Sequence, residues 1–424
     1  MDVTKLKNKI LSGGFDGDFI KLYGETENSR SRYAGACDKF LEYFKTGDNM
    51  MLFSAPGRTE VGGNHTDHQH GKVLAGSVNL DVIAVACKNS DNVVRIKSAG
   101  YPMDEIRLDS LDIDPAETGR AASLIRGMCA FIKEKGFEFG GFDAYTTSNV
   151  LKGSGLSSSA AFEVLIGNII SGLFGCDIPA VEIAKIAQKA ENVYFGKPSG
   201  LMDQMASSVG GFTGIDFKDT DNPVIERVDF DLKAQKHSLC IINTGGNHAD
   251  LTSDYAAITD DCKKISGYFG AGYLREVEEA AFYDKIGALR AEFGDRAVLR
   301  AIHFFDDNKR ALLEKEALKN GDFSEFLRLI NESGNSSYKY LQNVFSVGAP
   351  NEQGLSLALC LTEKYLNGRG ACRVHGGGFA GTIQCFVPDD MLDGYKAMIE
   401  KVFGAGSCYV LNIRPIGGHV LEGE

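Results

Sequence analysis

The 424-residue sequence lacks the features that mark several large classes of protein. Its longest apolar segment, residues 164–175, is too short and too polar to cross a lipid bilayer. Residues 1–14 alternate charged and apolar side chains, so they do not resemble a secretory signal. Lysine and arginine form no cluster, and 57 acidic against 45 basic residues give a net charge of −12. We therefore expect neither nucleic acid nor a membrane as a partner.

The ten cysteines show neither the spacing of a metal site nor that of a disulfide framework. None forms a C-x-x-C pair, and they occur singly among apolar residues, as at Cys87 and Cys360. This distribution is typical of reduced, mostly buried thiols, so we expect a cytoplasmic protein. Only nine prolines are present, and no proline-rich linker, internal repeat or low-complexity segment divides the chain.

The length favours two domains, and the hydrophobic pattern predicts strands and helices in both. The first half contains strand-like runs at 50–55, 82–87 and 93–98 and helical patterns at 121–135 and 157–172. The second half contains a strand at 238–244, helices at 274–293, 296–304, 308–319, 323–345 and 353–367, and closing strands within 371–388 and 407–415. This irregular order indicates an α+β fold. The polar segment 215–235 predicts the boundary, which divides the chain into domains 1–218 and 219–424.

The segment GSGLSSSAA at 153–161 predicts an anion site. Its two glycines allow a ligand to approach the backbone closely, and a helical pattern follows its three serines. Because the first N–H groups of a helix lack internal partners, they bind phosphate well, and a triphosphate is the expected ligand. The chain has no G-x-x-x-x-G-K-[ST], so this is not a Walker loop. The alternative is an ordinary turn in which serines cap a helix.

Two further segments each allow a functional and a structural interpretation. Residues 371–382, ACRVHGGGFAGT, contain three consecutive glycines, which are more than a tight hairpin usually needs. This loop either lies against a bulky ligand or is a flexible turn. Asp203 lies at a predicted helix start in GLMDQ, where it is either a base or a partner of the helix dipole. Glu191 lies twelve residues earlier and on its own is typical of a solvated helix charge.

The segment GGNHTDHQHG at 62–71 concentrates three of the eight histidines within six positions, together with Asp67. Closely spaced histidines on a loop can bind a transition metal such as zinc. The alternative is that these polar side chains hold a small polar substrate.

Taken together, the four segments resemble the motifs of the GHMP small-molecule kinases over nearly the whole chain. The family motif P-G-R-x-N-[LI]-[IL]-G-E-H-T-D-Y is matched at Pro56, Gly57, Arg58, Gly63, His65, Thr66 and Asp67. G-x-G-L-S-S-S-A is matched at 153–160, G-[IL]-M-D-Q at 200–204 and G-G-G-F-x-G at 376–381. The resemblance implies an N-terminal domain like domain 2 of ribosomal protein S5, with a left-handed βαβ unit. It also implies a ferredoxin-like C-terminal domain and an active site in the cleft between the two.

Within the family, the chain is similar to the members that use Mg·ATP to phosphorylate galactose at its anomeric hydroxyl. The resemblance makes Asp203 the base and Arg58 the cation that neutralises charge at the transferred phosphoryl group. It assigns the sugar to Asn64, His65, Asp67, Gly200, Asp203 and Tyr255. It assigns ATP to Ser98, Gly153, Ser154, Gly155, Leu156, Ser157, Ser158, Ser159 and Ala160. It makes Ser159 and Glu191 the Mg²⁺ ligands. We expect the protein to act as a monomer.

Under this resemblance the histidine segment binds sugar rather than zinc. Asp67 then accepts hydrogen bonds from the C3 and C4 hydroxyls, while His68 and His70 lie at the surface or behind the site.

Three positions depart from the family motif: Asn64 replaces the usual Glu, His68 replaces Tyr and Glu60 replaces Asn. In the family that Glu accepts a hydrogen bond from the C6 hydroxyl of the sugar. An amide oxygen can still accept this bond, but without the charge of a carboxylate. We therefore expect Asn64 to face the C6 end of the sugar and the sugar preference to differ.

The chain contains no tryptophan, and Ala121 lies near a position where relatives often carry an aromatic residue beside adenine. Packing around the purine is therefore expected to differ. Two other functions remain open: a GHMP kinase for a different or modified sugar, and a non-catalytic sensor of sugar and ATP. A sensor is expected to lose the base or damage the serine loop, whereas Arg58, Asp203 and GLSSSAA are all present.

Overall fold

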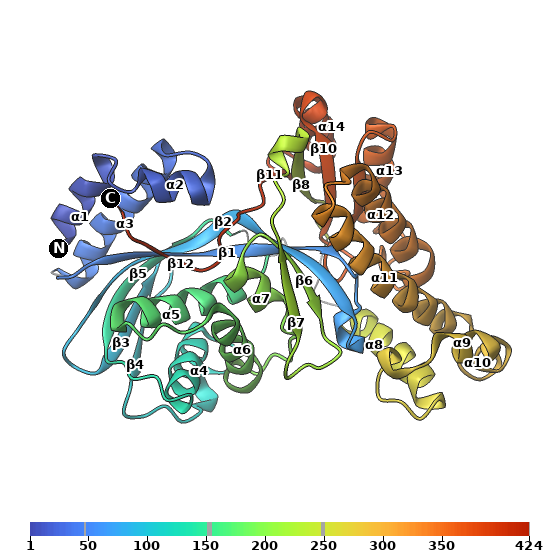
Figure 1. Cartoon of the computed structure of the whole chain (residues 1–424), viewed down its shortest axis with the longest axis horizontal. Helices are drawn as coiled ribbons and strands as arrows, with labels where there is room; N and C mark the ends of the chain where they lie inside the picture. Colours follow the sequence, from blue (N-terminus) through green and yellow to red (C-terminus); the bar gives the residue numbers. More distant parts are fainter. Residues whose placement is uncertain (46–47, 151–154, 247–250, 424) are drawn as a thin grey trace.

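The computed structural model describes residues 1–45, 48–150, 155–246 and 251–423 (Figure 1). Its helices are α1 Val3–Leu11, α2 Asp16–Tyr23, α3 Glu27–Phe44, α4 Ala121–Glu134, α5 Ser158–Phe174, α6 Ala180–Ala190, α7 Met202–Val209, α8 Thr252–Tyr268, α9 Glu279–Asp284, α10 Ile286–Phe293, α11 Asp295–Lys319, α12 Phe323–Ser336, α13 Gly354–Leu366 and α14 Leu392–Phe403. Its strands are β1 Met51–Gly62, β2 Lys72–Lys88, β3 Val93–Ser98, β4 Met103–Arg107, β5 Phe142–Ser148, β6 Phe212–Asp216, β7 Val224–Val228, β8 His237–Asn243, β9 Ala371–Val374, β10 Thr382–Pro388, β11 Cys408–Leu411 and β12 His419–Leu421. Within these ranges, no helix combines the length and apolar character needed to cross a membrane.

The strands form two sheets, which confirms the predicted α+β class. The large sheet has the order β12-β1-β2-β5-β3-β4, with β6 paired to β2 and β7 paired to β6. Its strands pair antiparallel except β3 and β5, which run parallel and are separated in the chain by β4 and α4. The small sheet has the order β11-β8-β10-β9 and is wholly antiparallel. The large sheet includes β7 and β12, so it extends past residue 218, where the sequence predicted the domain boundary.

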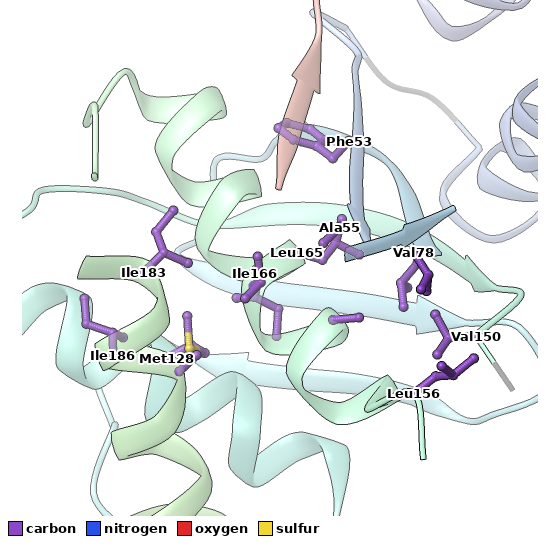
Figure 2. Close-up of a cluster of buried hydrophobic side chains, with 14 of the residues drawn as sticks. Phe53, Ala55, Val78, Met128, Val150, Leu156, Leu165, Ile166, Ile183 and Ile186 are labelled. Atoms are coloured by element: carbon purple, nitrogen blue, oxygen red, sulfur yellow. The ribbon is translucent and has the colours of Figure 1, made fainter. Parts of the chain in front are cut away.

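Both faces of the large sheet are buried. On β1 and β2, Leu52 and Ile83 belong to the cluster formed with α1, α2 and α3, whereas Phe53 and Ala84 belong to the cluster formed with α4, α5 and α6. Alternate residues of a strand point to opposite faces, so two covered faces require the nearly continuous apolar runs found in these strands. Figure 2 shows the second of these clusters, where Ile166 on α5 packs against the sheet.

The helices of the second half differ from the prediction in one functionally important place. The segments 296–304 and 308–319 form one helix, α11. Asp307, which lies between the two predicted helices, is fully buried and accepts a hydrogen bond from the backbone N–H of Asn64 at 2.8 Å. Arg310 pairs with the same carboxylate. These polar residues therefore connect α11 to the end of β1.

The other differences in this half are smaller. The predicted helix at 274–293 is divided into α9 and α10, and α12 ends at Ser336 in a π-helical turn, Ser337–Leu341.

Candidate active site

A cavity of about 230 Å³ brings together three of the four motif segments. It lies among the end of β1, the turn that follows it, the start of α7 and the glycine loop between β9 and β10. The residues that line it are Arg58, Glu60, His65, Asp67, His68, Lys197, Pro198, Ser199, Gly200, Met202, Asp203, Gly376 and Gly377. A larger cavity of about 940 Å³ lies beside α1 and β2, but none of the motif residues lines it. The smaller cavity is therefore the candidate active site.

Asp203 and Arg58 form an ion pair at this cavity. Arg58 Nε donates to Asp203 Oδ1 at 2.6 Å, and Arg58 also donates to the carbonyl of Gly155. The hydroxyl of Ser157 donates to the other oxygen of Asp203. Both carboxylate oxygens are therefore held in place, and they connect α7 to the serine loop. The structure thus brings together the two residues that the sequence predicted to be catalytic.

The serine loop is attached to β1 just before α5 begins. Gly153 and Ser154, both assigned to the nucleotide, lie outside the described residues. The backbone N–H of Arg58 donates to the carbonyl of Leu156 at 3.0 Å. Ser157 adopts left-handed backbone angles, φ 53° and ψ 66°, directly before the first helical residue. A non-glycine residue in this region costs about 1–3 kcal/mol, and such strained residues cluster at active sites and ligand clamps.

The remaining residues assigned to the nucleotide lie at the start of α5 and at the end of β3. Ser158, Ser159 and Ala160 form the first turn of α5, so their N–H groups lie at the end of a helix that attracts anions. Ser98 ends β3, and its hydroxyl accepts a hydrogen bond from Thr146 on β5 at 2.9 Å. It therefore lies on the strand beside the one that leads into the loop, and it does not line the cavity.

Ser159 and Glu191 lie together as the magnesium assignment requires. The hydroxyl of Ser159 donates to Glu191 Oε1 at 3.1 Å, and the carboxylate is almost completely buried. Lys197 Nζ lies 2.9 Å from the same oxygen, while Ser199 and Gln204 donate to Oε2. A hydroxyl beside a carboxylate is a hard oxygen donor set, which fits Mg²⁺. The Lys197 side chain is itself exposed, so burial does not fix it at Oε1.

His65 and Asp67 lie on the side of the cavity nearest the glycine loop and Gly200. His65 Nε2 lies 2.9 Å from the carbonyl of Gly377. Burial, together with the nearby His68, lowers the pKa of His65 to about 4, so the ring is neutral at pH 7 and donates to this carbonyl. A Cβ at Gly200 would lie 2.9 Å from Asp67 Oδ2, so the lack of a side chain there lets the carboxylate approach α7.

The zinc alternative finds no support in the described residues, because they contain no group of three His, Cys, Asp or Glu side chains placed to hold a metal. The side chain of His68 is about half exposed, at 48%. His70 stacks on Tyr273 with ring centroids 3.5 Å apart.

The assignment of Asn64 to the sugar must be corrected. Its side chain is fully buried, and its amide group donates to Glu60 Oε1 at 2.9 Å and to the carbonyl of Gly376 at 2.8 Å. Its oxygen accepts from the hydroxyl of Ser337 and the amide of Asn343. All four bonds that an asparagine side chain usually makes are thus taken by protein groups. Asn64 supports the cavity from behind and does not face it.

Tyr255 contacts the glycine loop beside the cavity. Its hydroxyl donates to the carbonyl of Gly378 at 3.0 Å, and its ring packs edge-on against Phe379 with centroids 5.4 Å apart. It does not line the cavity. Tyr255 therefore positions the glycine loop, and its ring lies against Gly377, which lines the cavity, so its assignment to the sugar stays a prediction.

Glu60, Lys197 and Ser199 line the cavity but were not predicted as site residues. Glu60 is 6% exposed and pairs with Arg373 at 2.6 Å. Burial raises the pKa of Glu60, against the opposing effect of Arg373. The sequence signal for Glu60 was its departure from the family motif. Lys197 and Ser199 lie directly before the GLMDQ motif, which was the only hint of their position.

Comparison with known proteins identifies the family. The GHMP kinases N terminal domain matches residues 123–211, and the galactokinase galactose-binding signature matches residues 38–88. A galactokinase from Actinobacillus pleuropneumoniae serotype 3 is 32% identical over 395 residues, which cover 91% of this chain and 98% of that protein. A galactokinase from Glaesserella parasuis serovar 5 is 30% identical over 86% of this chain and 91% of that protein.

Solved structures agree. Lactococcus lactis galactokinase complexed with galactose superimposes with a TM-score of 0.76 at 25% identity, over 90% of this chain and 98% of that one. A mevalonate kinase from Methanococcus jannaschii superimposes with a TM-score of 0.61 at 13% identity, over 86% of this chain and 98% of that one, and shows the shared fold alone. The two family matches include Arg58, His65, Asp67 and Asp203, which line the cavity. The chain therefore belongs to the galactokinases within the GHMP kinase family.

Proposed function

We propose that this protein transfers the γ-phosphoryl group of ATP to the anomeric hydroxyl of galactose, with Mg²⁺ as the metal. The observation that carries the proposal is the Arg58–Asp203 pair, which joins the polar cavity to the serine loop. The galactose-binding signature includes Arg58, His65 and Asp67, and the Lactococcus lactis relative is a galactose complex. We further propose that the enzyme is a cytoplasmic monomer that acts without nucleic acid or membrane.

The geometry suggests a division of roles. Asp203 accepts the proton of the anomeric hydroxyl as its oxygen attacks the γ-phosphorus and ADP departs. Ser157 and Arg58 hold the carboxylate, and the Arg58 cation stabilises the negative charge on the transferred group. The N–H groups at the start of α5 receive the phosphates. A magnesium ion held by Ser159 and Glu191 would neutralise phosphate charge.

A panel of sugars tests the proposal directly. Purified protein with Mg·ATP should release ADP with galactose, and the product should carry its phosphate at C1. Preference for another sugar would favour the second candidate, a GHMP kinase for a modified sugar. Two observations support this candidate: Asn64 is buried, and Glu60 lines the cavity. Sugar binding without any turnover would indicate a sensor and contradict the proposed activity.

Ser159→Ala tests the magnesium assignment. The substitution removes the hydroxyl beside Glu191 but leaves the backbone N–H groups of α5 in place. We expect the Mg²⁺ concentration for half-maximal activity to rise about tenfold, within the range seen when a group around a metal is lost. The measurement is initial rate against Mg²⁺ at saturating galactose. Ser158→Ala, one residue earlier, is the control and should leave the magnesium curve unchanged. An unaltered curve for Ser159→Ala would refute the assignment.

A further inference from the structure

Glu60 differs from the other acidic groups near the cavity because one of its oxygens is fully engaged and the other is not. Oε1 accepts hydrogen bonds from Arg373 at 2.6 Å and from Asn64 at 2.9 Å. Oε2 accepts no hydrogen bond from the described part of the chain. It is also absent from the set of fully buried polar atoms that lack a partner there, so Oε2 is not fully buried. Since Glu60 lines the cavity, Oε2 is the oxygen that a ligand can reach.

The groups that hold Oε1 are themselves immobile. Arg373 on β9 is fully buried and also donates to the carbonyls of Val61 and Val374, at 2.6 and 3.0 Å. Asn64 is fixed by its four hydrogen bonds. The carboxylate of Glu60 therefore has little freedom to turn away from the cavity. Such rigidity is what a selective hydrogen-bond acceptor requires.

The position of Glu60 along β1 sets which part of a substrate it can meet. Arg58, Thr59 and Glu60 pair in regular register with Ser77, Gly76 and Ala75 on β2. Arg58 and Glu60 therefore point to the same face of the strand, with Cα atoms about 7 Å apart. Because Arg58 holds Asp203, the proposed base, Glu60 lies on the same face of β1 two residues beyond the site of proton transfer. After Glu60 the register shifts before Gly62, and such a bulge redirects the chain at the rim of a site.

We propose that Glu60 is a specificity-determining residue, whose Oε2 accepts a hydrogen bond from one sugar hydroxyl other than the one that is phosphorylated. This inference rests on the proposed function and adds to it. The substrate is then a neutral sugar with a free hydroxyl at that position. A sugar that lacks this hydroxyl leaves a buried carboxylate oxygen without a partner, which a site of this kind rejects strongly. Asn64 and Arg373 serve as positioning residues for Glu60.

The test combines enzyme variants with deoxy sugars. The galactose derivatives that lack the C2, C3, C4 or C6 hydroxyl are assayed with the unmodified protein and with Glu60→Gln, and kcat and KM are measured separately. For one derivative, the loss of kcat/KM relative to galactose should be at least tenfold greater in the unmodified protein than in Glu60→Gln. The other derivatives should lose the same factor in both proteins.

Two further variants make the result interpretable. Glu314→Gln changes a fully buried acid on α11 that lies against Gly62 but does not line the cavity, so it should show no such difference for any derivative. Glu60→Asp keeps a charge for Arg373 while shortening the side chain, and it replaces Glu60→Gln if that variant does not fold. Equal losses in the unmodified protein and the Glu60 variants for all four derivatives would overturn the inference. The absence of galactose phosphorylation by the unmodified protein would instead remove the proposed function, and this inference with it.

Discussion

Asp203→Asn should lower kcat for galactose by about 10²–10⁴-fold, the usual contribution of a positioned general base. The substitution keeps the size of the side chain and an oxygen that can accept the Arg58 hydrogen bond, but it removes the charge that takes the hydroxyl proton. Since Ser157 still fixes the start of α5 near residue 203, the fold and the cavity should survive. The measurements are kcat with saturating Mg·ATP and galactose affinity by calorimetry in the absence of nucleotide.

Asp67→Asn is the matched control for this prediction. Asp67 lines the same cavity but lies on the turn after β1, and its Oδ1 accepts the backbone N–H of His68 at 2.9 Å rather than an arginine hydrogen bond. Its loss should raise the KM for galactose more than it lowers kcat, because it removes binding that is similar in ground and transition states. If Asp203→Asn retained near-normal kcat, Asp203 would be a structural partner of Arg58 and another group would have to act as the base.

The contrast between Asn64 and Glu60 shows how far sequence reasoning reaches in this protein. The motifs located Arg58 and Asp203, which the structure brings within hydrogen-bond distance across 145 positions of the chain. The same motifs misplaced Asn64. A motif gives the order of residues, but it does not show which side chain at the end of β1 points into the cavity. The orientation depends on Arg373, more than 300 residues away, whose contact with Glu60 has no local sequence signal.

The fold was predictable to a similar degree. Apolar runs identified β1, β2 and β8 because strands with buried surfaces have a strong local signal. The three residues of β12 carry no such signal, and they join the large sheet only because the end of the chain returns to β1. The sequence predicted two helices where α11 is continuous, and Asp307 in the middle of α11 is buried against Asn64. Long-range polar contacts are therefore the main feature that local patterns did not show.

One such contact network, centred on Asp81, joins the N-terminal helices, the large sheet and the C-terminal segment. Asp81 on β2 is fully buried and accepts hydrogen bonds from Tyr23, Arg32, Ser54 and Arg414. Burial alone would raise the pKa of Asp81, but Arg32 and Arg414 outweigh it and hold the pKa below 3.8. Arg414 is itself almost completely buried, so the loss of this carboxylate would leave a buried cation without its counter-charge.

Asp81→Asn should therefore lower the free energy of unfolding by about 3–5 kcal/mol at pH 7, the cost of breaking a buried ion pair from one side. Because the folded pKa is depressed, the wild-type carboxylate contributes its stability above the unfolded pKa and loses it as pH falls through the folded pKa. The difference between the two proteins should then be largest at neutral pH and should shrink below about pH 3.8. The measurement is denaturant unfolding across this pH range.

Asp38→Asn is the control, because it removes an exposed pairing with Lys7 on the same N-terminal helices and should cost less than about 1 kcal/mol. Equal, small losses in the two variants would mean that the Asp81 network does not hold these segments together.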